Sequence, residues 1–215
     1  MIHNLSDQDS LLGNYMAELR DIEIQRDPVR FRLNMQRIAE IMGYEISKSL
    51  PYKTISVETP LGVSSDRVLQ EQPVLITILR AGLAMHTGLM RCFDRAESAF
   101  VSAYRKHLTP EEFEIYVEYL AAPNLDGRIW IISDPMLATG NSMNTVFDAL
   151  IKVGIPKKIF IATALATPQA LARVQAHFPP NTLIYTAAID QELTAQSYIV
   201  PGLGDAGDLA FGHKI

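Results

Sequence analysis

The stretch IWIISDPMLATGNS, residues 129–142, joins an apolar run to a carboxylate and then to a series of small and hydroxyl residues. The run IWII (129–132) does not alternate between apolar and polar residues, which is typical of a strand buried on both faces of a parallel sheet. Asp134 follows almost at once, and Thr139-Gly140-Asn141-Ser142 leads into a predicted helix over 142–153. This order of strand, loop and helix is the repeating unit of an α/β fold.

Four further runs predict strands of the same sheet. Three of them are as apolar as the first, and the fourth is weaker: VLITIL (74–79), AFVSAY (99–104), IFIATAL (159–165) and TLIYTAAI (182–189). A proline at a first helical position, after a capping residue, predicts helices that begin at Asp27-Pro28 and Thr167-Pro168. Strands that alternate with helices imply right-handed crossovers, so we expect a doubly wound, mostly parallel sheet flanked by helices.

Three other segments complete the predicted organisation. An apolar face over 11–24 predicts a first helix, and alternation over 53–58 predicts a strand. Residues 105–127 are polar and break the rhythm, with a predicted strand over 114–120, so we expect a projecting hairpin at about 104–123. Because no linker interrupts the chain, residues 1–215 are expected to form a single domain.

Composition narrows the class of protein. The chain has 215 residues, is 48% hydrophobic and 20% charged, and carries a net charge of −5 without a basic block, which argues against general nucleic-acid binding. Cys92 is the only cysteine, and the five histidines show no metal-ligand spacing. The N-terminus lacks the regions of a signal peptide, and no apolar run approaches the roughly 20 residues that cross a bilayer. We expect a cytoplasmic protein without membrane contact.

The opening stretch has the chemistry of a sugar-phosphate site. Ligands of open α/β sheets bind beyond the carboxyl ends of the strands, where Asp134 is expected to lie. The free N–H groups of the next helix favour an anion, Thr139 and Ser142 add hydroxyl donors, and Gly140 allows a phosphate close to the backbone. The alternative is purely structural: the hydroxyls cap a helix, and Asp134 starts a turn before Pro135. Spacing alone leaves the two interpretations about even.

Several motifs together resemble one family. DPMLATGNS (134–142) resembles the loop of phosphoribosyltransferases that binds 5-phosphoribosyl 1-pyrophosphate (PRPP), and more narrowly the DPMLATGGS loop of the uracil phosphoribosyltransferase family. Five further stretches resemble that family in the same order: ETPLG (58–62), ILRAGLAM (78–85), Ala103-Tyr104-Arg105, IYTAAID (184–190) and YIVPGLGDAGDLAFG (198–212). The similarity spans roughly residues 11–215.

The resemblance implies transfer of the phosphoribosyl group from PRPP to uracil, giving uridine monophosphate (UMP) and pyrophosphate in pyrimidine salvage. It implies that Asp134, Arg105 and Asp205 act in catalysis, with Asp134 accepting hydrogen bonds from the ribose hydroxyls. The implied PRPP-binding residues are Arg80, Ala81, Gly82, Arg105, Asp134, Pro135, Met136, Leu137, Ala138, Thr139, Gly140, Asn141, Ser142 and Asp205. The implied uracil-binding residues are Ile199, Gly204, Asp205 and Ala206, in a base-binding segment at about 190–215.

The resemblance also implies partners. Mg²⁺ would be held mainly by the oxygens of PRPP, so no dedicated protein ligands are expected. A GTP-type allosteric effector and a homodimer or larger homo-oligomer are further expectations. The first helix (Leu12, Tyr15, Met16, Leu19) and the hairpin tyrosines Tyr116 and Tyr119 are expected to supply self-complementary contacts.

The sequence departs from the family pattern in places, and two rival functions stay open. Asn141 stands where the family usually has glycine; asparagine tolerates the left-handed region, so the loop is expected to keep its shape. Residues 105–123 differ most from the family's hairpin. One rival is a phosphoribosyltransferase for another base, and the other is a non-catalytic regulator that senses a pyrimidine nucleotide and binds RNA.

Overall fold

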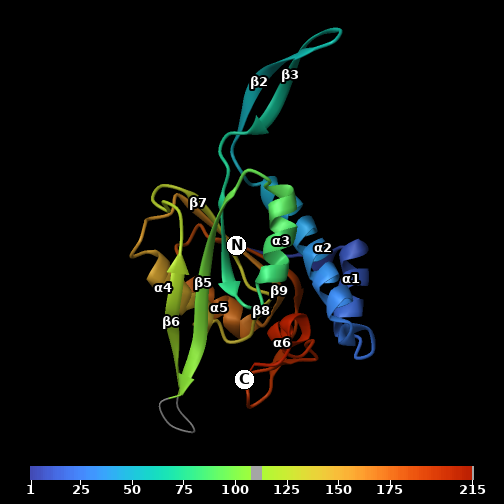
Figure 1. Cartoon of the computed structure of the whole chain (residues 1–215), viewed down its shortest axis with the longest axis vertical. Coiled ribbons are helices and arrows are strands. Elements are labelled where there is room, and N and C mark those ends of the chain that lie inside the picture. Colours follow the sequence, from blue (N-terminus) through green and yellow to red (C-terminus); the bar gives the residue numbers. More distant parts are fainter. Residues whose placement is uncertain (108–112, 215) are drawn as a thin grey trace.

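A central sheet of eight strands organises the molecule (Figure 1). The computed structural model describes residues 1–107 and 113–214, apart from the side chains of residues 103–107 and 113–116. Neighbouring strands follow the order β1-β10-β9-β7-β4-β5-β6, β8 pairs with β9, and only β6 among these is antiparallel to its neighbour. The strands are β1 (Ile2–Asn4), β4 (Val74–Leu79), β5 (Glu97–His107), β6 (Phe113–Ala121), β7 (Ile129–Ser133), β8 (Met136–Leu137), β9 (Lys158–Ala166) and β10 (Leu183–Ile189).

Helices cover both faces of this sheet, as the alternation of elements predicts. One apolar cluster joins the sheet to α1 (Leu11–Arg20), α2 (Pro28–Ser47), α3 (Leu83–Cys92) and α6 (Ala206–Phe211). A second cluster joins the opposite face to α4 (Asn141–Leu150) and α5 (Pro168–His177). Short 3-10 turns lie at Leu5–Asp7 and Ile24–Arg26, and a small ribbon pairs β11 (Glu192–Leu193) with β12 (Ile199–Val200). Within the described part of the chain, no helix is both long and apolar enough to span a bilayer.

The predicted helix starts are confirmed by their caps. The Asp27 carboxylate accepts hydrogen bonds from the N–H groups of Val29 and Arg30, and Pro28 is the first residue of α2. The Thr167 hydroxyl accepts from the Ala170 N–H at the start of α5. All five predicted strands of the central sheet are present, and β7 is buried along its whole length.

The hairpins differ in part from the prediction. β5 and β6 pair in antiparallel register, so the predicted hairpin exists, and β6 closes one edge of the central sheet. A second hairpin, β2 (Tyr52–Thr59) with β3 (Gly62–Leu69), stands clear of the body in Figure 1. Only its first strand was expected from the sequence. β3 is mostly exposed, so it lacks the apolar alternation that burial on one face produces.

The first helix does not offer the expected contact surface. Leu12, Met16 and Leu19 are at most 5% exposed and belong to the core between α1 and the sheet. Their apolar spacing therefore reflects packing within the subunit. Of the hairpin tyrosines, Tyr119 is 55% exposed, and the side chain of Tyr116 lies outside the described residues.

The strand order reverses between β4 and β7. From β4 the chain continues to β5 on one side, whereas β7, β9 and β10 succeed one another on the other side. In open α/β sheets such a switch point leaves a crevice at the carboxyl ends of the two strands. Residues that follow Leu79 and Ser133 therefore face the place where a ligand is expected.

Candidate active site

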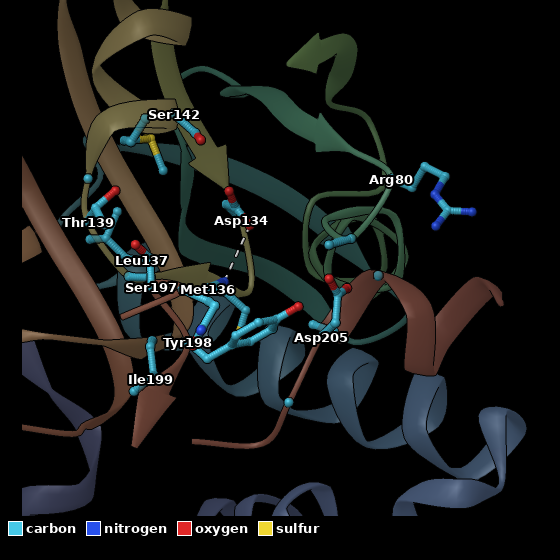
Figure 2. A pocket seen from close by; sticks show the side chains of 18 of the residues that line it. Arg80, Asp134, Met136, Leu137, Thr139, Ser142, Ser197, Tyr198, Ile199 and Asp205 are labelled. Carbon is cyan, nitrogen blue, oxygen red and sulfur yellow. Dashed lines mark hydrogen bonds between the residues drawn. The ribbon is translucent and has the colours of Figure 1, made fainter. Parts of the chain in front are cut away.

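A cavity of about 850 Å³ opens at this edge of the sheet. Its walls come from the ends of β4 and β7, from the middle of β5, from the loop that leads into α4, and from the chain segment that leads into α6 (Figure 2). The lining residues are Leu79, Arg80, Ala81, Ser102, Asp134, Met136, Leu137, Ala138, Thr139, Gly140, Ser142, Met143, Gln196, Ser197, Tyr198, Ile199, Gly204, Asp205, Ala206, Gly207 and Lys214.

The loop 134–142 is fixed to the end of β9. The Asp134 N–H donates to the Ala162 carbonyl at 3.2 Å, and β8 pairs with Leu165 and Ala166 in parallel register. Beyond β9, the Thr167 hydroxyl donates to the Ala138 carbonyl at 2.7 Å. The backbone of the loop is therefore set by the sheet before any ligand binds.

Gly140 makes the sharp turn that ends this loop. Its φ of +80° lies in the left-handed region, and a Cβ here would lie 3.2 Å from the Ala170 carbonyl oxygen. Position 140 therefore favours glycine for two reasons: the left-handed backbone conformation and the close approach to α5. α4 begins immediately afterwards, so its N-terminal turn, with the Thr139 and Ser142 side chains, borders the cavity.

The expectation for Asn141 is wrong. Asn141 is the first residue of α4 and has helical backbone geometry, so it does not need left-handed tolerance; Gly140 takes that role. Its side chain also lies outside the cavity lining, because its Oδ1 accepts a hydrogen bond from Arg173 at 2.7 Å. Arg173 donates to the Thr139 carbonyl as well, at 2.9 Å. Asn141 therefore supports the loop from its outer side.

Asp134 lies half-buried on the cavity wall. Burial raises the pKa of its carboxyl to about 7, although a hydrogen bond from the Met136 N–H, 3.3 Å away, acts in the opposite direction. Perturbed carboxyl groups of this kind are common in active sites. Asp134 therefore lies at the ligand-binding edge of the sheet, as expected from its place after a buried strand.

The segment after β4 presents Arg80 and Ala81 to the cavity. Arg80 Nη2 donates to Asp208 Oδ1 at 3.2 Å and to the Gly212 carbonyl at 3.1 Å. In Figure 2 its side chain extends away from the other labelled residues. Gly82 lies behind the wall, where a Cβ would approach the Ile78 carbonyl oxygen to 2.7 Å; it allows α3 to begin close to β4.

The C-terminal segment supplies the opposite wall. Ile199 is 4% exposed and anchors the segment in the core, while Gly204 has a φ of +92°. Asp205 caps α6, because its Oδ1 accepts from the Asp208 N–H at 3.0 Å. After the short strand β12, residues 201–205 form a loop, and α6 begins at Ala206.

The structure brings most of the predicted site residues to one cavity. Thirteen line it: Arg80, Ala81, Asp134, Met136, Leu137, Ala138, Thr139, Gly140, Ser142, Ile199, Gly204, Asp205 and Ala206. Gly82, Pro135 and Asn141 do not, since the first two are packed beneath the surface and the third points outward. Arg105 belongs to β5 opposite Ile115, and its side chain lies outside the described residues.

Sequence reasoning missed several lining residues. Ser102, in the middle of β5, pairs with Leu79 at the end of the parallel strand β4, a register that the sequence does not display. Ser197 and Tyr198 precede the predicted base-binding residues directly. Lys214 adds a cation near the chain's end and carried no motif. Among the described residues, no group of three or more His, Cys, Asp or Glu is placed to hold a metal ion.

Comparison with known proteins gives a consistent result. The family model described as uracil phosphoribosyltransferase matches residues 6–213. The chain is 49% identical to a uracil phosphoribosyltransferase of Porphyromonas gingivalis over 215 residues, covering 100% of this chain and 99% of the relative. A Pyrococcus furiosus protein of the same name is 37% identical over 203 residues, covering 93% and 85%. A solved structure of an Aquifex aeolicus protein superposes with a TM-score of 0.87 at 28% identity, over 100% of both chains.

Proposed function

The chain belongs to the uracil phosphoribosyltransferase family, and from this membership we infer that it transfers the phosphoribosyl group of PRPP to uracil, giving UMP and pyrophosphate. One observation supports this cavity as the site of the reaction. The loop 138–142, which we call the anion cradle, and the C-terminal base-binding segment line the same cavity. A phosphate site and a base site in one cavity are what a phosphoribosyl transfer requires, because donor and acceptor must meet.

We propose that the loop 138–142 holds the 5-phosphate of PRPP. The α4 N-terminus, the Thr139 hydroxyl and the Ser142 hydroxyl offer donors that suit phosphate oxygens. Asp134, next to this cradle, accepts hydrogen bonds from the ribose hydroxyls in its ionised form. As pyrophosphate departs, positive charge develops on the ribose ring, and the Asp134 carboxylate stabilises it.

The leaving pyrophosphate needs cationic partners. We propose that Arg80, with the backbone of Ala81, binds it, because a guanidinium fork matches phosphate oxygens. Arg80 would then exchange its present partners, Asp208 and the Gly212 carbonyl, for the pyrophosphate. Lys214 lines the same cavity and adds a second cation. For Arg105 the proposal rests on the family resemblance alone.

Mg²⁺ fits this donor set as an ion that arrives with PRPP. Two carboxylates, Asp134 and Asp205, line the cavity, which is fewer than a dedicated protein cage provides. Phosphate and ribose oxygens with water would supply the remaining ligands. When bound, the ion neutralises charge on the pyrophosphate. The residues of this chain orient the donor around it.

Product analysis tests the function and its nearest rival together. The purified protein is incubated with PRPP, Mg²⁺ and one base at a time: uracil, cytosine, hypoxanthine or orotate. We expect UMP from uracil as the dominant nucleotide. A nucleotide formed from another base, with none from uracil, would show that the family membership does not extend to the choice of base.

The first prediction concerns the cradle. Gly140→Val should raise the KM for PRPP by about tenfold or more, because a strained left-handed valine costs about 1–3 kcal/mol and the loop shifts to relieve it. Gly127→Val is the matched control: Gly127 also has a positive φ, +68°, but lies outside the cavity lining. Steady-state kinetics giving the same KM for PRPP in both variants would show that Gly140 does not shape the donor site.

The second prediction concerns assembly. We propose a homodimer or larger homo-oligomer, supported by the exposed Tyr119 on β6, a sheet edge that offers unpaired backbone groups. Light scattering at micromolar concentration should give at least twice the chain mass of 23.9 kDa. A mass of one chain at every concentration would contradict this. The single-domain organisation, the GTP-type effector and the cytoplasmic location stay predictions.

A further inference from the structure

A paired set of charges joins the first helix to the base-binding segment. Arg20, the last residue of α1, meets Asp190, which directly follows β10. Arg20 Nη1 lies 2.7 Å from Asp190 Oδ2, and Nη2 lies 2.8 Å from Oδ1, so the contact is bidentate. The Asp190 side chain is only 8% exposed, which removes most of the screening that weakens surface pairs.

The same two side chains hold both backbone groups of Gly202. The Gly202 N–H donates to Asp190 Oδ2 at 2.9 Å, and Arg20 Nη1 donates to the Gly202 carbonyl at 2.9 Å. Gly202 has a φ of +62°, and a Cβ there would lie 2.0 Å from the Ile199 carbonyl oxygen. The backbone turn at Gly202 is therefore tight and is fixed from two directions.

This turn lies between two parts of the cavity wall. Ile199 comes three residues before Gly202, and Gly204 comes two residues after it. Burial alone raises the pKa of the Asp190 carboxyl, but the hydrogen bonds from Arg20 and the Gly202 N–H outweigh it and leave the pKa below its usual value. The carboxyl is thus held in its ionised, hydrogen-bonded form at neutral pH.

Both halves of the cavity are anchored at one point of the sheet. The Asp190 N–H donates to the Ala166 carbonyl at 2.9 Å, at the end of β9. Leu137 pairs with the same Ala166; it belongs to the loop 134–142, which we propose binds the donor PRPP and call the donor loop. Ala166 therefore contacts both the loop 134–142 and, through Asp190, the base-binding segment, so it fixes the position of one relative to the other.

We propose that Arg20 and Asp190 are positioning residues for uracil: by holding Gly202, the pair sets where the base-binding segment lies relative to the bound donor. The inference rests on the proposed function. Neither side chain lines the cavity, so both act through the backbone of the segment. Loss of the pair should displace the base contacts and leave the loop 134–142 in place, because β9 and α5 hold that loop independently.

The test separates the two Michaelis constants. Arg20→Lys keeps the charge but loses the fork, and Asp190→Asn places an amide N–H₂ opposite the guanidinium. In each variant we expect the KM for uracil to rise about tenfold or more. A displacement of binding groups by about 1 Å can lower the efficiency of a reaction by up to 10²-fold. We expect the KM for PRPP to stay within about twofold, because the donor loop does not move.

A neighbouring ion pair gives a matched control. Glu18 lies on the same helix and forms a bidentate pair with Arg30 of α2, at 2.6 Å and 2.7 Å. Among the described residues, that pair makes no hydrogen bond to the base-binding segment. Glu18→Gln and Arg30→Lys should lower the melting temperature without changing the KM for uracil, which separates a general loss of stability from misplacement of the base.

Each outcome decides the proposal. A raised KM for uracil in the Arg20 and Asp190 variants, absent from the controls, supports it. Unchanged uracil KM values in an active background, or equal rises for both substrates, would overturn it. Should Asp190→Asn fail to fold, the milder Arg20→Lys decides alone. A wild type that forms no UMP would overturn the proposed function and this inference with it, whereas unchanged values in an active enzyme overturn only the inference.

Discussion

Cytosine should be used with a kcat/KM about 10⁴-fold lower than that of uracil. Uracil presents an N3–H donor between two carbonyl acceptors, and cytosine reverses this pattern at N3 and C4. We propose that backbone N–H and C=O groups around Ile199 and Gly204-Asp205-Ala206, which line the cavity, read this pattern. The segment cannot adapt easily, because Ile199 is buried and Gly202 is held on both sides. Cytosine would leave desolvated groups unpaired.

Steady-state kinetics with both bases at saturating PRPP measures this ratio. A variant sharpens the result: Gly204→Val should abolish the use of uracil, because Gly204 lines the cavity with a φ of +92°, which a branched residue rarely adopts, so the segment would shift to relieve the strain. Gly127→Val again controls for the general cost of a positive φ. Comparable kcat/KM values for the two bases in the wild type would contradict readout by this backbone.

Asp134→Asn should lower turnover by roughly 10²-fold or more, an effect comparable to the loss of one preorganised electrostatic contact. The carboxylate sits beside the phosphate cradle, where the ribose of PRPP would lie, and asparagine keeps its shape without its charge. Asp148→Asn serves as the control: Asp148 lies on α4 and pairs with His177 at 2.7 Å, outside the cavity. Near-normal turnover in Asp134→Asn would refute the assignment.

The raised pKa of Asp134 adds a pH signature to this prediction. The carboxyl titrates at about 7 in the free protein, so it is protonated below that pH and ionised above it. Because ribose hydroxyls donate to the ionised form, kcat/KM for PRPP should rise as the pH increases through about 7. Asp134→Asn should lose this limb of the profile. A wild-type profile that stays flat between pH 6 and 8 would argue against a role for the ionised carboxylate.

Stability should follow the opposite sign. A folded-state pKa above the unfolded value means that ionisation of Asp134 costs stability, and the cost grows from about pH 4 to pH 7. Asp134→Asn removes it, so its melting temperature at pH 8 should match or exceed that of the wild type. The gain would mark a residue kept for function at some expense of stability.

The sequence predicts best those elements whose burial leaves a period. β4, β7 and β9 are apolar without alternation because both faces are covered, and the capping residues before Pro28 and Pro168 place two helix starts correctly. The donor loop follows from the same logic, since a polar residue directly after a buried parallel strand must lie at the ligand-binding edge.

Features set by tertiary contacts were not predictable from local pattern. The exposed β3 strand buries neither face and leaves no alternation to recognise. Asn141 was given the left-handed role that Gly140 fills, because both flank the same turn and sequence does not show which residue carries the positive φ. The contact of Arg20 with Asp190 spans 170 residues, and only the folded chain brings the two together.

In our proposal, one cavity brings PRPP and uracil together for transfer. The most direct test supplies the wild-type protein with labelled uracil, PRPP and Mg²⁺ and measures UMP and pyrophosphate in the same samples over time. We expect UMP and pyrophosphate to accumulate at equal rates, and the formation of each to depend on the presence of uracil. Uracil recovered unchanged, or pyrophosphate released without UMP, would contradict the proposal.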